Sequence, residues 1–173
     1  MKKRTKCSRY LSIDYKLKTE DIEMSVANMY DFQQNLIFPN ISWGLGLHEC
    51  DLLVIRPSNY AIEIEIKISI ADLKADFKKS HNHIDRKNRI KELYYAIPNY
   101  LYDKAIELIP ETAGIITCSV NSKKGIIESK IVRRAKINTT ARKLTDDEKN
   151  KALRLGSIRY WFFKDKILKL KNS

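Results

Sequence analysis

The sequence has little of what marks a secreted or membrane protein. Its 173 residues include three cysteines, Cys7, Cys50 and Cys118, an odd number with no CxxC pair, which argues against a disulfide scaffold and for a reducing compartment. No run approaches the roughly 18 apolar residues that a spanning helix needs, and the basic start at residues 1–4 leads into polar sequence rather than the core of a signal peptide. We therefore expect a cytoplasmic protein with no membrane partner.

Glycine and proline are also scarce, with five and four residues, and no repeat, low-complexity tract or flexible linker divides the chain. Hydrophobic residues make up 43% and charged residues 31% of the sequence, which excludes a disordered chain. A chain of this length has room for one domain with a hydrophobic core. We divide it into a basic N-terminal arm (1–18), a core domain (19–137) and a basic C-terminal helical extension (138–173) packed on the core.

Charge is unevenly distributed along the chain, whose formal net charge is +12. Residues 1–18 contain seven basic and one acidic residue, and residues 121–173 contain sixteen basic and five acidic residues, whereas 19–120 contain ten basic and fifteen acidic residues. The basic ends favour a polyanion partner such as nucleic acid, although solubility alone is a second explanation for them. The acidic middle segment indicates carboxylates that are kept despite such a partner.

Hydrophobic periodicity and turn residues predict the order of secondary structure. The expected helices cover 19–33, 70–80, 100–109 and 145 to 160 or beyond, and the expected strands cover 36–43, 48–55, 61–68, 93–97, 113–120 and 126–132. Thr19 is the expected N-cap of the first helix, and Thr145 with Glu148 forms a capping box for the last. The order αβββαβαββα predicts a mixed α/β fold with a central sheet flanked by helices.

The strand at 61–68 carries the residues best suited to chemistry. Its isoleucines alternate with Glu63, Glu65 and Lys67, which share the opposite face. If this strand pairs with the preceding one around the turn at 56–60, Asp51 lies beside Glu65, close enough to share a divalent ion. Two neighbouring carboxylates suit Mg²⁺ or Mn²⁺, and a lysine next to them suits orienting a water molecule or neutralising a phosphoryl group. The pattern therefore points to phosphodiester hydrolysis.

Asp51, thirteen intervening residues and then Glu65-Ile66-Lys67 resemble the PD-(D/E)xK motif of restriction-endonuclease-like nucleases, with Cys50 in place of the usual proline. The αβββαβ order resembles the core of that superfamily, here followed by a C-terminal hairpin and helix. The segments HECDLL, EIEIKISIADLKADFKK, LYYAIP and PETAGII further resemble the MmcB-like branch associated with DNA repair. The resemblance covers roughly residues 36–120.

This resemblance implies roles for individual residues. Asp51 and Glu65 would be metal ligands together with the backbone carbonyl of Ile66, and Lys67 would be the catalytic lysine. Such nucleases often add an acid from the first helix, for which Glu23 is preferred over Glu20. Glu63 is left open between a supporting acid and a solvated side chain.

Several basic and aromatic residues are candidates for nucleic-acid binding. Lys74, Lys78 and His81 recur at helical spacing after the catalytic strand, and Arg133, Arg134 and Lys136 form a second patch; a solvated helix face explains the first group equally well. The aromatic run at 160–163, next to Arg159, suits base stacking, but we prefer a place in the core for it. Phosphate contacts of this kind give affinity without sequence choice.

The expected function is a Mg²⁺- or Mn²⁺-dependent DNA endonuclease or repair nuclease. Two alternatives remain open: a DNA-binding module of the same fold that no longer cuts, and an RNA-processing nuclease that shares the site. Many nucleases of this fold dimerise, so a homodimer is also open. A zinc site made of His48, Cys50, His81 and His83 is disfavoured because the HxC and HxH spacings are unusual for zinc.

Overall fold

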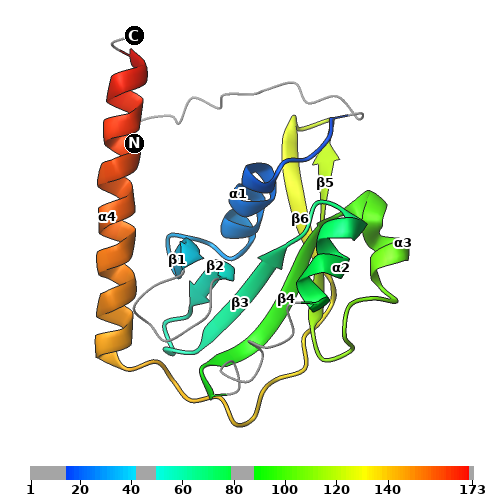
Figure 1. The fold of residues 1–173 in the computed structure, drawn as a ribbon, viewed down its shortest axis with the longest axis horizontal. Helices are drawn as coiled ribbons and strands as arrows, with labels where there is room; N and C mark the ends of the chain where they lie inside the picture. Colours follow the sequence, from blue (N-terminus) through cyan, green and yellow to red (C-terminus); the bar gives the residue numbers. More distant parts are fainter. Residues whose placement is uncertain (1–14, 42–49, 79–87, 172–173) are drawn as a thin grey trace.

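A computed structural model describes residues 15–41, 50–78 and 88–171 of the chain. Its core is a six-stranded sheet in the order β1-β2-β3-β4-β5-β6, with helices on both faces (Figure 1). The elements are α1 (Thr19–Met29), β1 (Leu36–Ile41), β2 (Cys50–Ile55), β3 (Ala61–Ile66), α2 (Ile70–Lys78), β4 (Ile90–Pro98), η3 (Asn99–Leu101), α3 (Tyr102–Ala105), β5 (Gly114–Asn121), β6 (Ile126–Arg133) and α4 (Asp146–Lys171). The predicted mixed α/β fold with a central sheet is confirmed.

The sheet mixes two kinds of strand pairing. β1, β2 and β3 are successively antiparallel, β3, β4 and β5 are successively parallel, and β6 returns antiparallel to β5. The parallel pairs require crossovers, which α2 supplies between β3 and β4, and η3 with α3 supply between β4 and β5. β3 and β4 therefore lie at the centre of the sheet.

β3 is covered on both of its faces. Ile62, Ile64 and Ile66 pack with α1 residues that include Ile22 and Val26. On the opposite face, α2 and α3 pack over β4 and β5 through a second apolar cluster. The side chains that β3 presents to that face are Glu63, Glu65 and Lys67, which are 0%, 4% and 7% exposed. A solvated Glu63, one of the two interpretations of the sequence, is therefore wrong.

Several helix ends differ from the sequence prediction. Lys18 rather than Thr19 is the N-cap of α1, because the Asp21 carboxylate accepts the Lys18 backbone N–H at 3.0 Å. α1 ends at Met29 instead of 33, since the chain turns at Asp31, whose φ is 52°. The helix expected over 100–109 is shorter and divided between η3 and α3.

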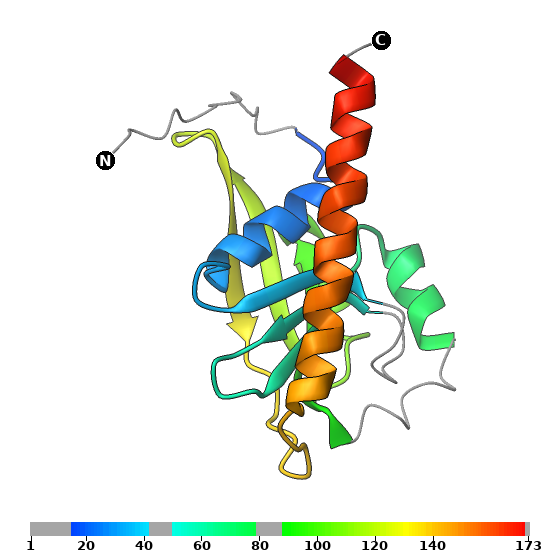
Figure 2. The same cartoon turned by 90° about the vertical axis from the view of Figure 1, so that its left-hand side faces the viewer.

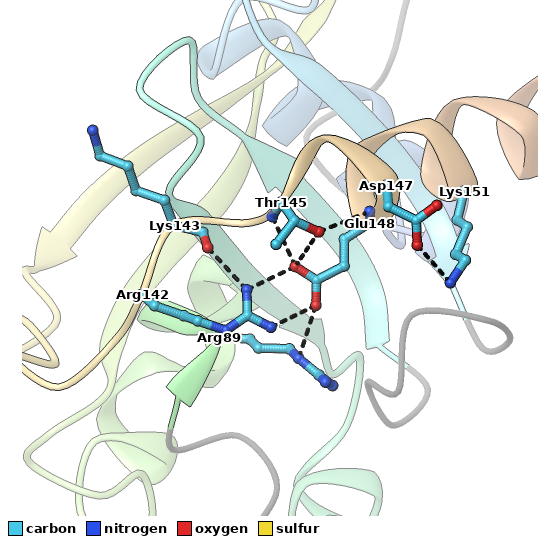
Figure 3. A network of polar contacts seen from close by, with 7 residues as sticks. All are labelled: Arg89, Arg142, Lys143, Thr145, Asp147, Glu148 and Lys151. Carbon is cyan, nitrogen blue, oxygen red and sulfur yellow. Dashed lines mark hydrogen bonds and ion pairs between the residues drawn. The ribbon is translucent and has the colours of Figure 1, made fainter.

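α4 begins on a polar network beneath the sheet (Figure 3). The expected capping box is confirmed: the Glu148 carboxylate accepts the Thr145 backbone N–H at 2.8 Å, and the Thr145 hydroxyl accepts the Glu148 N–H at 3.2 Å. The same carboxylate forms two hydrogen bonds to Arg142, at 2.6 and 2.7 Å, and an ion pair with Arg89 at 3.1 Å. These contacts fix the direction in which α4 leaves the domain.

From there α4 runs beside β1 (Figure 2). Gly156 lies against the Phe38 ring, and the Arg159 guanidinium donates to the backbone carbonyls of Pro39 and Asn40. The aromatic run at 160–163 is exposed, so its expected place in the core is wrong; Tyr160 and Phe163 line an open groove beside β1 instead. None of the described helices is long and apolar enough to cross a membrane.

Gly114, at the start of β5, gives a prediction for the fold. A Cβ atom at this position would lie 2.3 Å from ring atoms of Tyr94 and 2.7 Å from the Ala135 backbone nitrogen. We expect Gly114→Ala to lower the free energy of unfolding by about 2 kcal/mol, because a buried ring and a backbone atom must both move. Urea denaturation would measure this, and Gly125→Ala, at a turn residue with a φ of 62°, would separate steric overlap from backbone strain. If Gly114→Ala left the free energy of unfolding unchanged, this would contradict the close approach of the Tyr94 ring to Gly114.

Candidate functional site

The candidate site lies where β2 begins and β3 ends. Leu52 pairs with Ile64 and Leu53 with Glu63 in the antiparallel ladder, so the next step of the same register sets Asp51 opposite Glu65. The two acids then project from the same face of the sheet, as the sequence led us to expect. The structure therefore brings Asp51, Glu65 and Lys67 together.

Lys67 is the centre of the cluster. Its ammonium nitrogen Nζ lies 2.9 Å from Glu65 Oε2, 3.3 Å from Asp76 Oδ1 and 3.6 Å from Asp51 Oδ2. The Lys67 side chain is 9% exposed and that of Glu65 is 6% exposed, whereas that of Asp51 is 30% exposed. The cluster is thus buried on the side of Glu65 and open to solvent on the side of Asp51.

The backbone of β3 adds an oxygen to the same place. The Ile66 N–H donates to Asp51 Oδ2 at 2.7 Å, while the N–H of the following residue, Lys67, donates to Ala96 of β4 at 3.0 Å. Because the N–H and C=O of one residue in a strand point to the same side, the Ile66 carbonyl faces β2 and Asp51. Two carboxylates and one backbone carbonyl therefore converge at the ends of β2 and β3.

Burial and charge act in opposite directions on these groups. Burial raises the pKa of Glu65, which the neighbouring Lys67 ammonium lowers only in part, and the negative charges of Glu63 and Asp51 raise it further. Burial alone would lower the pKa of Lys67, but Glu65, Asp51 and Asp76 outweigh burial and raise it. The ammonium is therefore held as a cation among carboxylates.

Asp76 of α2 is a member of the cluster that the motif did not indicate. Besides its ion pair with Lys67, it accepts a hydrogen bond from the hydroxyl of Tyr95, on β4, at 3.2 Å. Its position was open to prediction, because it follows the buried Leu73 by three residues and so lies on the sheet-facing side of the helix. Asp76 thus joins Asp51 and Glu65 as a third carboxylate paired with Lys67.

Glu23 lies near this cluster without completing it. It is half-buried and accepts a hydrogen bond from Asn40 Nδ2 at 3.3 Å. Burial raises its pKa, the Asn40 hydrogen bond lowers it, and the charges of Glu20 and Asp51 raise it again. The part of the chain that the structure describes contains no group of three His, Cys, Asp or Glu side chains able to hold a metal ion. Glu23 is thus near Asp51 but does not form a three-carboxylate site with Asp51 and Glu65.

The donor set nevertheless suits one kind of ion. Mg²⁺ is commonly bound by one or two carboxylates, keeps several water molecules and takes further oxygens from a phosphate. Asp51, Glu65 and the Ile66 carbonyl supply hard oxygens of this type. Such oxygen ligands suit Mg²⁺ or Mn²⁺, whereas zinc prefers nitrogen and sulfur ligands.

Most of the expected nucleic-acid contacts lie away from the cluster. Lys74 is exposed on α2, whereas the Lys78 side chain, His81, His48 and His83 fall outside the described residues. Arg133 donates through Nε and Nη2 to the carbonyls of Ala113, Ile109 and Pro110 at 2.9 to 3.1 Å, so it ties down the segment between α3 and β5, and its contact with phosphate stays a prediction. Arg134 and Lys136 are exposed after the end of β6, and Lys136 lines a pocket with residues at the start of β4, the end of the sheet away from the cluster.

Comparison with known proteins supports the fold alone. No protein-family model matches the sequence, and no curated protein sequence is similar to it. A solved structure, the SPO1766 protein of unknown function from Silicibacter pomeroyi, is similar with a TM-score of 0.62 and 17% sequence identity, over 92% of this chain and 97% of the other. The two chains thus share nearly their whole architecture.

Proposed function

We propose that this protein is a metal-dependent nuclease that hydrolyses phosphodiester bonds in DNA. The observation that carries the proposal is the buried Lys67 ammonium, which lies within 3.6 Å of carboxylate oxygens of both Asp51 and Glu65. The order of these residues along the chain resembles the PD-(D/E)xK motif. A buried cluster of charges contributes little to stability, because desolvation offsets the attraction between the charges, so a functional role explains it better than a structural one.

Each residue of the cluster has a defined part in this proposal. Asp51, Glu65 and the Ile66 carbonyl would hold Mg²⁺ or Mn²⁺, which, when bound, neutralises charge on the phosphate and acts as a Lewis acid. Lys67, held as a cation, would contact the phosphate that is cut and stabilise the negative charge developing on its oxygens. Asp76 and Tyr95 would position Lys67. The basic segments of the chain, which account for the net charge of +12, would supply affinity for the phosphate backbone.

A cleavage assay tests the proposal. The purified protein is incubated with single-stranded, duplex and flapped DNA, and with RNA, in the presence of Mg²⁺ or Mn²⁺. We expect cleavage of DNA that falls by about 10²–10³-fold or more in Asp51→Asn and Lys67→Met, because each removes an interaction that stabilises the developing charge. Asp103→Asn and Lys104→Met, two exposed positions of α3, are matched controls that should cut like the unmodified protein. Cleavage that persists in Asp51→Asn would overturn the assignment of the site.

A second candidate is a DNA-binding protein of the same fold that does not cut. One observation favours it: Lys67 already forms ion pairs with Asp51 and Glu65, and the described residues contain no group of three His, Cys, Asp or Glu side chains placed to hold a metal ion. Titration calorimetry with Mn²⁺ separates the two candidates. A binding site for Mn²⁺ that is lost in Asp51→Asn supports the nuclease, whereas DNA binding without any Mn²⁺ binding supports the second candidate.

A further inference from the structure

The last part of α4 is an exposed arm, which we define as residues 160–171. Tyr160, Trp161, Phe162 and Phe163 are 57% to 72% exposed, and Leu168 and Leu170 are 50% and 68% exposed. Figures 1 and 2 both show this end of α4 extending past the strands beside it. Large apolar side chains that remain in water at this density mark a surface that binds something.

The arm extends towards the end of the sheet that carries the candidate site. Along α4, Gly156 contacts Phe38, Arg159 contacts Pro39 and Asn40, and Phe163 lines a groove with Ile41, so α4 and β1 run in the same direction. β1 ends at Ile41, which pairs with Cys50, the residue before Asp51. The arm therefore passes the same end of the sheet at which Asp51, Glu65 and Lys67 cluster.

The composition of the arm restricts what it can bind. Successive residues of a helix point about 100° apart, so the four consecutive aromatic rings project around the whole helix instead of along one face. A second copy of the helix or the plane of a membrane would cover a single apolar stripe, here Tyr160, Phe163, Ile167 and Leu170. It would leave Trp161 and Phe162 in water. Four lysines and one aspartate also give the arm a net charge of +3, which disfavours pairing with a second copy of itself.

Aromatic rings and lysine side chains lie next to each other on the arm. The Lys164 ammonium lies 5.0 Å from the centre of the Trp161 ring, and Tyr160 meets Trp161 edge to face at 5.5 Å between ring centres. Exposed rings on which bases stack, next to cations that contact phosphates, are the combination that binds single-stranded nucleic acid without sequence preference. We propose that the arm of α4 binds single-stranded DNA and guides it to the end of the sheet that carries the candidate site.

The choice of DNA rests on the proposed function, but binding by the arm requires neither metal nor cleavage. Fluorescence anisotropy with a labelled 20-nucleotide oligothymidine in EDTA therefore tests the arm alone. We expect Trp161→Leu/Phe162→Leu to weaken binding by about 30-fold or more, since each of the two rings stacks a base and each stacked base contributes about 1–3 kcal/mol. Leucine keeps an apolar, helix-forming side chain, so a purely hydrophobic contact would survive the change. Lys104→Met, at an exposed position of α3 outside the arm, should leave this affinity unchanged.

Two further readouts locate the contact. The sequence has two tryptophans, Trp43 and Trp161, so in Trp43→Phe the tryptophan emission reports on Trp161, and we expect oligothymidine to quench it. Replacing Lys164 and Lys166 by glutamine should reduce the slope of log affinity against log salt by about 1.4, because each phosphate contact on a single strand contributes about 0.7.

Three results would overturn the inference. The first is an unchanged oligothymidine affinity in Trp161→Leu/Phe162→Leu. The second is a dimer in analytical ultracentrifugation that these substitutions abolish, which would make the arm an interface between copies of the chain. The third is binding to anionic phospholipid vesicles through the arm with no quenching of Trp161 by oligothymidine. DNA cleavage that continues while the arm fails these tests would reject the inference and leave the proposed function intact.

Discussion

Replacing Lys67 by methionine is expected to lower the free energy of unfolding by about 3–5 kcal/mol above about pH 8, where Glu65 is ionised in the unmodified protein, because removal of one partner leaves a buried charge uncompensated. Methionine matches the length of the lysine stem and leaves the apolar packing in place. The ammonium it removes lies 2.9 Å from Glu65, whose side chain is 6% exposed. Urea denaturation in EDTA measures the effect without a contribution from bound metal.

The pH dependence of this loss identifies its cause. Burial raises the pKa of Glu65, and without Lys67 it rises further. A carboxyl group with a raised pKa in the folded state favours folding below its unfolded value of 4.5 and loses that contribution as the pH rises through the folded pKa. In the unmodified protein the folded pKa is about 8, so both proteins lose stability alike up to that pH, and the destabilisation by Lys67→Met should grow as the pH rises above about 8.

Two comparisons check this explanation. Lys67→Met/Glu65→Gln should recover most of the lost stability and show little of the added pH dependence, because it removes both charges. Lys74→Met, at an exposed position of α2, should change stability by no more than about 0.5 kcal/mol. A loss of the same size at pH 7 and pH 10 would show that the free-energy cost comes from packing and not from charge.

Glu148→Gln is expected to lower the free energy of unfolding by about 2–3 kcal/mol at pH 7. Hydrogen bonds from Arg142 offset the burial of Glu148 and, with the Thr145 N–H and the charges of Arg142 and Arg89, lower its pKa from 4.5 to about 2. Each pKa unit corresponds to about 1.4 kcal/mol, and the partial exposure of Arg142 reduces the total. The affected contacts are those that fix the start of α4 (Figure 3).

Here the pH dependence has the opposite sign to that of Glu65. A carboxyl group with a lowered pKa contributes stability above its unfolded value of 4.5, and that contribution is lost as the pH falls through about 2. The stability difference between Glu148→Gln and the unmodified protein should thus shrink between pH 4.5 and pH 2. Asp147→Asn is the matched control, because Asp147 forms an exposed ion pair with Lys151 one turn along α4, and it should cost under about 1 kcal/mol. A difference that is constant with pH would contradict the ionic origin of the effect.

The sequence predicts the sheet and the site better than it predicts burial. Alternation along 61–68 identifies β3 and its register with β2, because the period of two is local. It does not reveal that α2 covers the polar face, since the glutamates and Lys67 have the composition of a solvated surface. Coverage depends on how a crossover helix packs, and that is a property of the tertiary structure.

Two other residues show that the sequence does not predict which side chains are buried or occupied. Arg133 is of a residue type that contacts phosphates, yet its Nε and Nη2 donate to three backbone carbonyls, an arrangement that depends on the position of the segment between α3 and β5. Trp161 is of a residue type that is often buried in a core, yet its side chain is exposed because no other described element covers its side of α4. Residue type gives the chemistry that a side chain can perform, and the neighbouring elements decide whether it is free to do so.

The contact between Arg159 and β1 has a consequence for association between molecules. β1 is an edge strand of the sheet, and a free edge strand is a template on which strands from other molecules add. Pro39 has no N–H to offer such a strand, and Arg159 already occupies the carbonyls of Pro39 and Asn40. Because α4 lies along this edge, it hinders the addition of strands from other molecules and so disfavours aggregation.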